Sequence, residues 1–152
     1  MARRPVLASS CAVAATAAEA RFRIDRPIDE TRRTTVIALD RGAEHIAAGA
    51  APEVSERVRF YNAAGDPGWG GAGAAVEGSD LVILVATPQL DRSTAAAVGR
   101  VCGRSRIPTF GLVVGRPLER AGAVSALRDQ TAMLMASETP LDLADILSDL
   151  RA

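Results

Sequence analysis

The chain has no lysine: all 18 of its basic side chains are arginine. This absence excludes a Walker-A phosphate-binding loop, because the lysine of that loop contacts the phosphates. It also excludes Schiff-base catalysis and a kinase-type active site, since each depends on a lysine amine. Codon bias in a GC-rich genome would also replace lysine by arginine, and the chemical exclusions hold under either explanation.

Other residue types are scarce in ways that exclude further classes of protein. Aromatic residues make up 3% of the chain and the net charge is +0, so we expect no nucleic-acid partner. No apolar run reaches the roughly eighteen residues of a membrane span, so none is expected. The two cysteines, Cys11 and Cys102, are too few for a disulfide framework, and His45 is the single histidine, so we expect no metal site.

The length of 152 residues predicts one domain, which we place at residues 34–152, after an N-terminal arm and connector at residues 1–33. Arg3 and Arg4 precede a small-residue apolar stretch at residues 6–18, as in a secretory signal. That stretch is mostly alanine, which is weak for a signal peptide. We therefore expect a cytoplasmic protein, with export as a minor alternative.

Strand and helix patterns alternate along the rest of the chain. Residues 81–86 are apolar throughout, as in a central parallel strand covered on both faces. Asp91 and Thr139 are expected to cap the helices that follow them, and Leu118 is expected to begin a buried helical stripe. The alternation predicts an α/β fold with a single doubly wound, mostly parallel, five- or six-stranded sheet and helices on both faces, as in Rossmann-like proteins. The predicted strands are residues 34–39, 58–62, 81–86, 108–114 and 131–136.

In such folds ligands bind beyond the carboxyl ends of the strands, where polar residues of this chain gather. Asp40 could bind a ribose hydroxyl or cap the next helix, and Arg116 could pair with a phosphate or solvate the rim. Ser93 and Thr94 could donate to an anion or be ordinary first-turn residues, and the glycine-rich loop at residues 65–73 could cradle an anion or be a surface loop. The candidate ligand-binding residues are Asp40, Arg41, Gly42, Asn62, Gly65, Thr87, Gln89, Ser93, Thr94 and Arg116.

Four segments resemble those of one known family. Residues 64–67, AGDP, are similar to a G-A-N-P loop, and residues 78–85, GSDLVILV, to a G-A-D-M-V-F-I strand. Residues 107–117, IPTFGLVVGRP, are similar to I-L-T-V-A-V-V-T-K-P, and residues 126–135, ALRDQTAMLM, to a helix ending in A-L followed by D-T-L-I-V-I. The family is FtsZ, the bacterial relative of tubulin, and the resemblance covers about residues 34–150 of this chain.

The resemblance implies a nucleotide as cofactor, held by backbone amides of glycine loops without any lysine. The composition by itself implies no cofactor firmly. Where FtsZ has G-G-G-T-G-T-G, however, residues 88–94 are PQLDRST, and Asp91 would place negative charge beside the phosphates. The first loop keeps only Gly42, and no counterpart of the activating second domain is expected before Ala152. We therefore expect no self-activated GTP hydrolysis.

The sequence contains no recognisable catalytic constellation, such as a nucleophile elbow or paired carboxylates at a telling spacing. The leading hypothesis is a degenerate FtsZ-like domain that acts through protein contacts, as a scaffold, an accessory subunit or a homo-oligomer, without hydrolysing GTP. The alternative is a small-molecule or nucleotide-binding protein, or an enzyme, that uses the crevice at the carboxyl ends of the strands. The residues leave the question of enzymatic activity open and lean against it.

Overall fold

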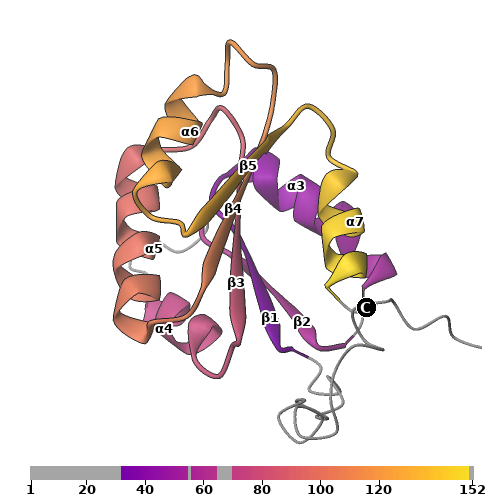
Figure 1. Cartoon of the computed structure of the whole chain (residues 1–152), viewed down its shortest axis with the longest axis vertical. Helices are drawn as coiled ribbons and strands as arrows, with labels where there is room; N and C mark the ends of the chain where they lie inside the picture. Colours follow the sequence, from indigo (N-terminus) through magenta and orange to yellow (C-terminus); the bar gives the residue numbers. More distant parts are fainter. Residues whose placement is uncertain (1–31, 55, 65–69, 151–152) are drawn as a thin grey trace, which may run out of the picture. The chain divides into compact units, whose positions relative to one another are not determined.

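The computed structural model describes residues 32–54, 56–64 and 70–150. Almost all of the predicted N-terminal arm lies outside these ranges, as does Gly65. The described chain forms a sheet of five parallel strands in the order β2-β1-β3-β4-β5 (Figure 1). This arrangement confirms the predicted α/β fold. The strands are β1 (Thr34–Ala38), β2 (Val58–Asn62), β3 (Leu81–Ala86), β4 (Thr109–Val114) and β5 (Met133–Ser137).

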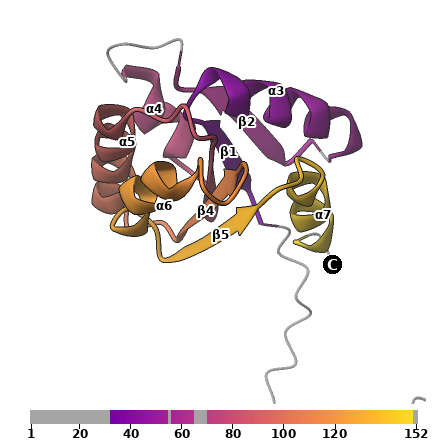
Figure 2. The same ribbon diagram turned by 90° about the horizontal axis from the view of Figure 1, so that it is seen from above.

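Helices cover both faces of the sheet, as Figures 1 and 2 show. One face carries α3 (Arg41–Ala50), which continues into a short 3-10 helix (Ala51–Glu53), and α7 (Asp142–Asp149). The other face carries α4 (Gly70–Val76), α5 (Arg92–Ser105) and α6 (Ala121–Arg128). Each strand is therefore joined to the next by a crossover that passes over one face, as parallel pairing requires.

The central strand β3 contributes to two hydrophobic cores, one on each face. Because side chains alternate along a strand, Ile83 and Val85 pack with α3 and α7, whereas Val82 and Leu84 pack with α5 and α6. These four side chains have no exposed surface. Burial on both faces explains why this strand is apolar at every position and why its sequence pattern is the clearest in the chain.

Two of the expected local features differ from the structure. Asp91 caps α5 as expected. Helix α7 begins at Asp142 and has Leu141 as its cap residue, two residues later than expected, although the Thr139 hydroxyl still accepts a hydrogen bond from the Leu141 N–H at 3.4 Å. The hydroxyl of Ser137 hydrogen-bonds the Asp142 carboxylate. Leu118 lies outside any helix and is 96% exposed, because the chain turns between β4 and α6 before the helix begins.

Candidate functional site

The strand order reverses direction between β1 and β3. From β1 the chain first adds β2 on one side, then crosses to the other side of β1 and adds β3, β4 and β5. In open parallel sheets such a reversal leaves a crevice beyond the carboxyl ends of the two strands, and this is where ligands of such folds bind. Asp40 and Thr87 follow β1 and β3 closely, so they lie at this point.

The Asp40 carboxylate is tied into the fold from two directions. Its Oδ1 accepts a hydrogen bond from the Ala43 N–H, at 2.9 Å, and so caps α3. Thr87 donates its N–H to Oδ2 at 2.7 Å and its hydroxyl to Oδ1 at 2.8 Å. Asp40 is only 7% exposed. We call this set of bonds the Asp40–Thr87 clamp, since it joins the start of α3 to the loop after β3. A ligand hydroxyl at Asp40 would have to compete with three internal bonds.

Close contacts among the neighbouring residues leave little space around the clamp. A Cβ atom added to Gly42 would lie 2.7 Å from the methyl carbon of Thr87, so the absence of a side chain lets α3 approach the loop after β3. The Gln89 N–H donates to the Thr87 hydroxyl at 3.4 Å. Gly115, after β4, lies equally close to Pro88, with 2.7 Å between an added Cβ and the proline ring. The packing of the loops therefore accounts for these two glycines.

The start of α5 carries a second carboxylate. Asp91 accepts hydrogen bonds from the Ser93 N–H, at 3.3 Å, and from the Ser93 hydroxyl. These bonds hold the pKa of Asp91 below its usual value, so the group is ionised at neutral pH. Thr94 follows in the first turn and is half-buried. The helix end at which the FtsZ family is expected to hold phosphate is thus occupied by a negative charge of this chain, which opposes a second anion.

The remaining candidate residues are not joined to the clamp by any hydrogen bond or ion pair found among the described residues. The Asn62 side-chain oxygen accepts from the Ala64 N–H at 2.9 Å, which closes a local turn after β2. Arg116 is 82% exposed in its side chain and lies 3.9 Å from Glu119. Arg41 is exposed, and its carbonyl lies 2.8 Å from Nδ1 of His45. The structure thus brings together Asp40, Gly42, Thr87 and Gln89, while Gly65 lies outside the described residues.

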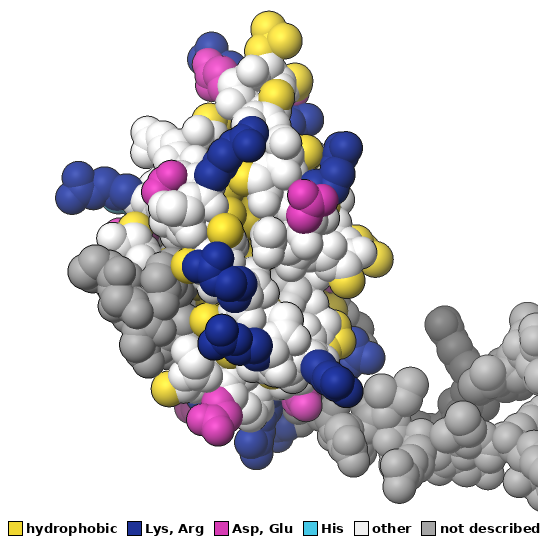
Figure 3. Space-filling model, turned by 90° about the vertical axis from the view of Figure 1, so that its left-hand side faces the viewer, with side chains coloured by type: hydrophobic (Ala, Val, Ile, Leu, Met, Phe, Trp, Pro, Cys, Tyr) yellow, Lys and Arg dark blue, Asp and Glu magenta, His cyan; other side chains and the backbone are white. Residues whose placement is uncertain are grey.

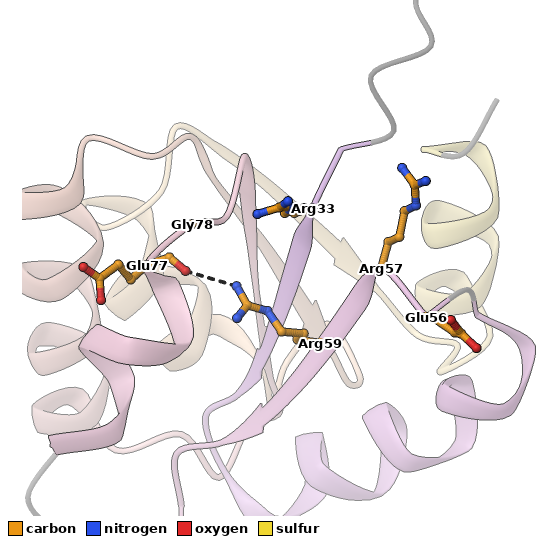
Figure 4. A pocket seen from close by; sticks show the side chains of 6 residues that line it. All are labelled: Arg33, Glu56, Arg57, Arg59, Glu77 and Gly78. Atoms are coloured by element: carbon orange, nitrogen blue, oxygen red, sulfur yellow. Dashed lines mark hydrogen bonds between the residues drawn. The ribbon is translucent and has the colours of Figure 1, made fainter.

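Sequence reasoning missed an arginine-lined hollow at the amino end of the sheet. The hollow has a volume of about 330 Å³ and is lined by Arg33, Glu56, Arg57, Arg59, Glu77 and Gly78. In Figure 4 the side chains of Arg33 and Arg59 point toward the turn at Gly78, whereas Arg57 points away from it. Arg59 donates to the Glu77 carbonyl at 3.1 Å and to the Ser79 hydroxyl at 3.3 Å, so it satisfies groups at the end of α4. The sequence signal for this hollow was the placement of arginines at the starts of β1 and β2.

Sequence reasoning predicted β5 as a strand but did not predict its exposure. Met133 is 66% exposed and Met135 is 39% exposed. Both residues occupy the same face of an edge strand, and no charged residue occurs within the strand. The face made by α5 and α6 is different, because charged side chains of both signs are spread over it (Figure 3), including the exposed Arg100 and Arg104 of α5.

Comparisons with known proteins add no relative. A scan against protein-family models and a search of curated proteins find no match to this chain. The resemblance to FtsZ and tubulin therefore stays a hypothesis that depends on the four sequence segments. Within the described ranges, no three His, Cys, Asp or Glu side chains are grouped so that they could hold a metal ion. No helix in those ranges has the length and apolarity needed to cross a bilayer.

Proposed function

We propose that this domain acts through contacts with protein chains, as a scaffold, an accessory subunit or a homo-oligomer, and does not hydrolyse a nucleotide. In this proposal the domain is a degenerate relative of FtsZ and tubulin that works in the cytoplasm. The observation that carries the proposal is the exposed apolar surface at β5. Three of the five exposed large hydrophobic residues in the described chain lie between residues 133 and 141, and they are Met133, Met135 and Leu141. Contiguous exposed apolar surface is typical of protein-contact sites, and these three exposed side chains lie close together in the sequence.

The chemistry at the carboxyl end of the sheet supports the second half of the proposal. The amides at the starts of α3 and α5 already donate to the carboxylates of Asp40 and Asp91. A nucleoside triphosphate needs such amides for its phosphates, and it would meet two negative charges in their place. Residues 88–94, at the start of α5, contain neither a lysine nor a glycine to offset that repulsion.

Nucleotide titration tests the proposal directly. Thermal unfolding of the full chain with millimolar GTP or GDP and magnesium should show no saturable rise in Tm, and phosphate release should stay at the buffer rate. Asp91→Asn is the informative variant, because it removes the exposed negative charge at α5 and keeps a capping side chain. A saturable Tm rise with GTP together with turnover in the unaltered chain would refute the proposal.

A second candidate function is the binding, with or without chemistry, of a small molecule or nucleotide in the crevice between β1 and β3. The observation that favours it is the convergence of Asp40 and Thr87 at the topological switch point. Mass spectrometry of the natively purified chain would test it. A stoichiometric small molecule that is lost in Thr87→Val, but kept in the distant variant Leu118→Ala, would favour this function over protein contacts.

A further inference from the structure

We infer that two copies of this chain associate through β5, which pairs antiparallel with β5 of the second copy around a two-fold axis at Met135. The inference rests on the proposed function and names the partner. The sheet of each copy would continue into the other, so that two five-stranded sheets form one. The partner of this edge strand is thus a second copy of the chain.

The outer edge of β5 is open in the described chain. β5 is the last strand of the sheet, and Figure 2 shows it at the edge between α6 and α7 with no other described element outside it. Some of its backbone N–H and C=O groups point toward β4, and the others point toward the open edge. The Ser137 carbonyl accepts from the Gly115 N–H at 2.9 Å, so the backbone groups of Ser137 point toward β4. Successive residues of a strand alternate, and those of Leu134 and Ala136 therefore point outward.

These outward groups match those of an antiparallel copy of the same strand. When the five residues of β5 overlap completely, Met135 lies opposite Met135, Leu134 opposite Ala136, and Met133 opposite Ser137. The outward N–H and C=O groups of Leu134 and Ala136 then face each other and can bond in both directions. Met135 falls in a non-hydrogen-bonded pair, where opposite side chains are closest. The partly exposed Met135 side chains would cover each other.

Charge does not oppose a second copy as the occupant. No residue of β5 is charged, so full overlap of the two strands places no like charges opposite each other. The whole chain has a net charge of +0, so two copies approach without net repulsion. The arrangement is isologous and closes at two copies. The other edge strand, β2, carries the exposed Arg59 and follows Arg57, and charged side chains discourage edge-to-edge pairing there.

Light scattering after size exclusion tests the inference on the full chain. We expect a species of twice the 15.8 kDa chain mass at micromolar concentration. Met135→Arg places like charges opposite each other at the two-fold axis and should weaken dimerisation by at least about tenfold. Leu118→Arg is the matched control, because Leu118 is 96% exposed in a turn away from β5, and it should leave the dimer intact. A monomeric unaltered chain, or a dimer insensitive to Met135→Arg, would overturn the inference.

Oxidative cross-linking tests the register. In a Cys11→Ser background, Met135→Cys should give a covalent dimer, since opposite Cβ atoms of such a pair lie about 4.5–5.5 Å apart and the thiols can reach each other. Met133→Cys should not, because that position faces Ser137 of the second copy. Cys102 is 2% exposed and should contribute no cross-link. Cross-linking at position 133 in preference to 135 would contradict the proposed pairing.

Failure of this inference can be told apart from failure of the proposed function. A monomer whose Leu134 and Ala136 amides resist hydrogen exchange would mean that another segment of the same chain covers β5, and it would exclude the dimer. A monomer that binds a different protein, and loses it in Met135→Arg, would also exclude the dimer but leave the proposed function standing. GTP turnover would remove the proposed function whatever the oligomeric state.

Discussion

The two edge strands of the sheet, β2 and β5, have the same length and the same parallel pairing, but they differ in how they meet solvent. β2 exposes Arg59, whose guanidinium is fixed to Glu77 and Ser79 at the end of α4. β5 exposes Met133 and Met135 and contains no charge. An edge strand with a charged side chain resists pairing with another chain, whereas an uncharged apolar edge invites it. Because β2 also exposes the apolar Phe60, the charge of Arg59 is what distinguishes the two edges. Under the dimer proposal, only β5 is open to association.

The largest expected loss of stability comes from a variant between the two edge strands. Asp40→Ala removes the Asp40–Thr87 clamp and leaves the Ala43 and Thr87 N–H groups without their partner. Loss of a buried carboxylate with several bonds should lower the free energy of unfolding by about 3 kcal/mol. Urea denaturation measures it. Asp91→Ala, at an exposed cap, should cost about 1 kcal/mol or less. Equal losses in the two variants would contradict the clamp.

A smaller loss of stability should affect β5 and leave β2 unchanged. A Cβ added at Gly111 would lie 2.7 Å from the Leu134 side chain and 3.0 Å from the Thr131 methyl carbon. Gly111→Ala therefore pushes β5 away from β4 and should cost about 2 kcal/mol. Hydrogen exchange should accelerate in β5 and stay unchanged in β2. Gly103→Ala is the control, because an added Cβ at Gly103 meets nothing within 4 Å and alanine favours the helix. Uniform acceleration across the sheet would count against independent edges.

Removing the charge from β2 should make the two edges alike. Arg59→Val deletes the bonds to Glu77 and Ser79 and should lower the free energy of unfolding by about 1 kcal/mol. It also leaves both edge strands uncharged, so light scattering should detect species larger than the dimer. Arg116→Val removes an exposed arginine from an ion pair with Glu119 and should do neither. If Arg59→Val does not associate further, edge charge is not what distinguishes β2 from β5.

The smallest effect concerns the thiol beneath the amino end of β5. Cys102 lines a hollow of about 480 Å³ with Thr109 and Ala132, and burial raises the pKa of its thiol. Below the ordinary pKa the thiol is neutral in both the folded and the unfolded chain. Between the ordinary pKa and the raised one, only the unfolded chain ionises, so the free energy of unfolding falls as pH rises through this range. Stability should therefore decline slightly above about pH 8.5. Cys102→Ala should abolish the decline, and an unchanged pH profile in that variant would exclude the thiol as its source.

Sequence patterns predicted most of the fold because strand and helix periodicities are local. The apolar run at residues 81–86 could only be a central strand, and all five predicted strands are present within a residue or two at each end. Leu118 was wrongly placed in a buried stripe because helical spacing continues through the turn before α6. The cap residue of α7 is Leu141, two residues later than predicted, although the Thr139 hydroxyl accepts from the Leu141 N–H. Asp142 bonds the Ser137 hydroxyl, a contact that spacing does not reveal.

The site was less predictable because it depends on contacts between distant residues. Asp40 and Thr87 were both recognised as candidates, but they are 47 residues apart in sequence, and the bonds between them depend on the strand order. The exposure of Met133 and Met135 also depends on the strand order. An apolar strand looks the same in sequence whether it lies at the centre or at the edge, and only the sheet order decides which.

The uniform direction of the strands has a consequence for any two-fold assembly. All five strands point the same way, so each sheet has two unlike ends, with the Asp40–Thr87 clamp at one and the arginine-lined hollow at the other. Antiparallel pairing at β5 would reverse one copy against the other. Each end of the joined sheet would then carry one clamp and one hollow. The two ends of such a dimer would be equivalent, so each end would present the same pair of surfaces to a partner.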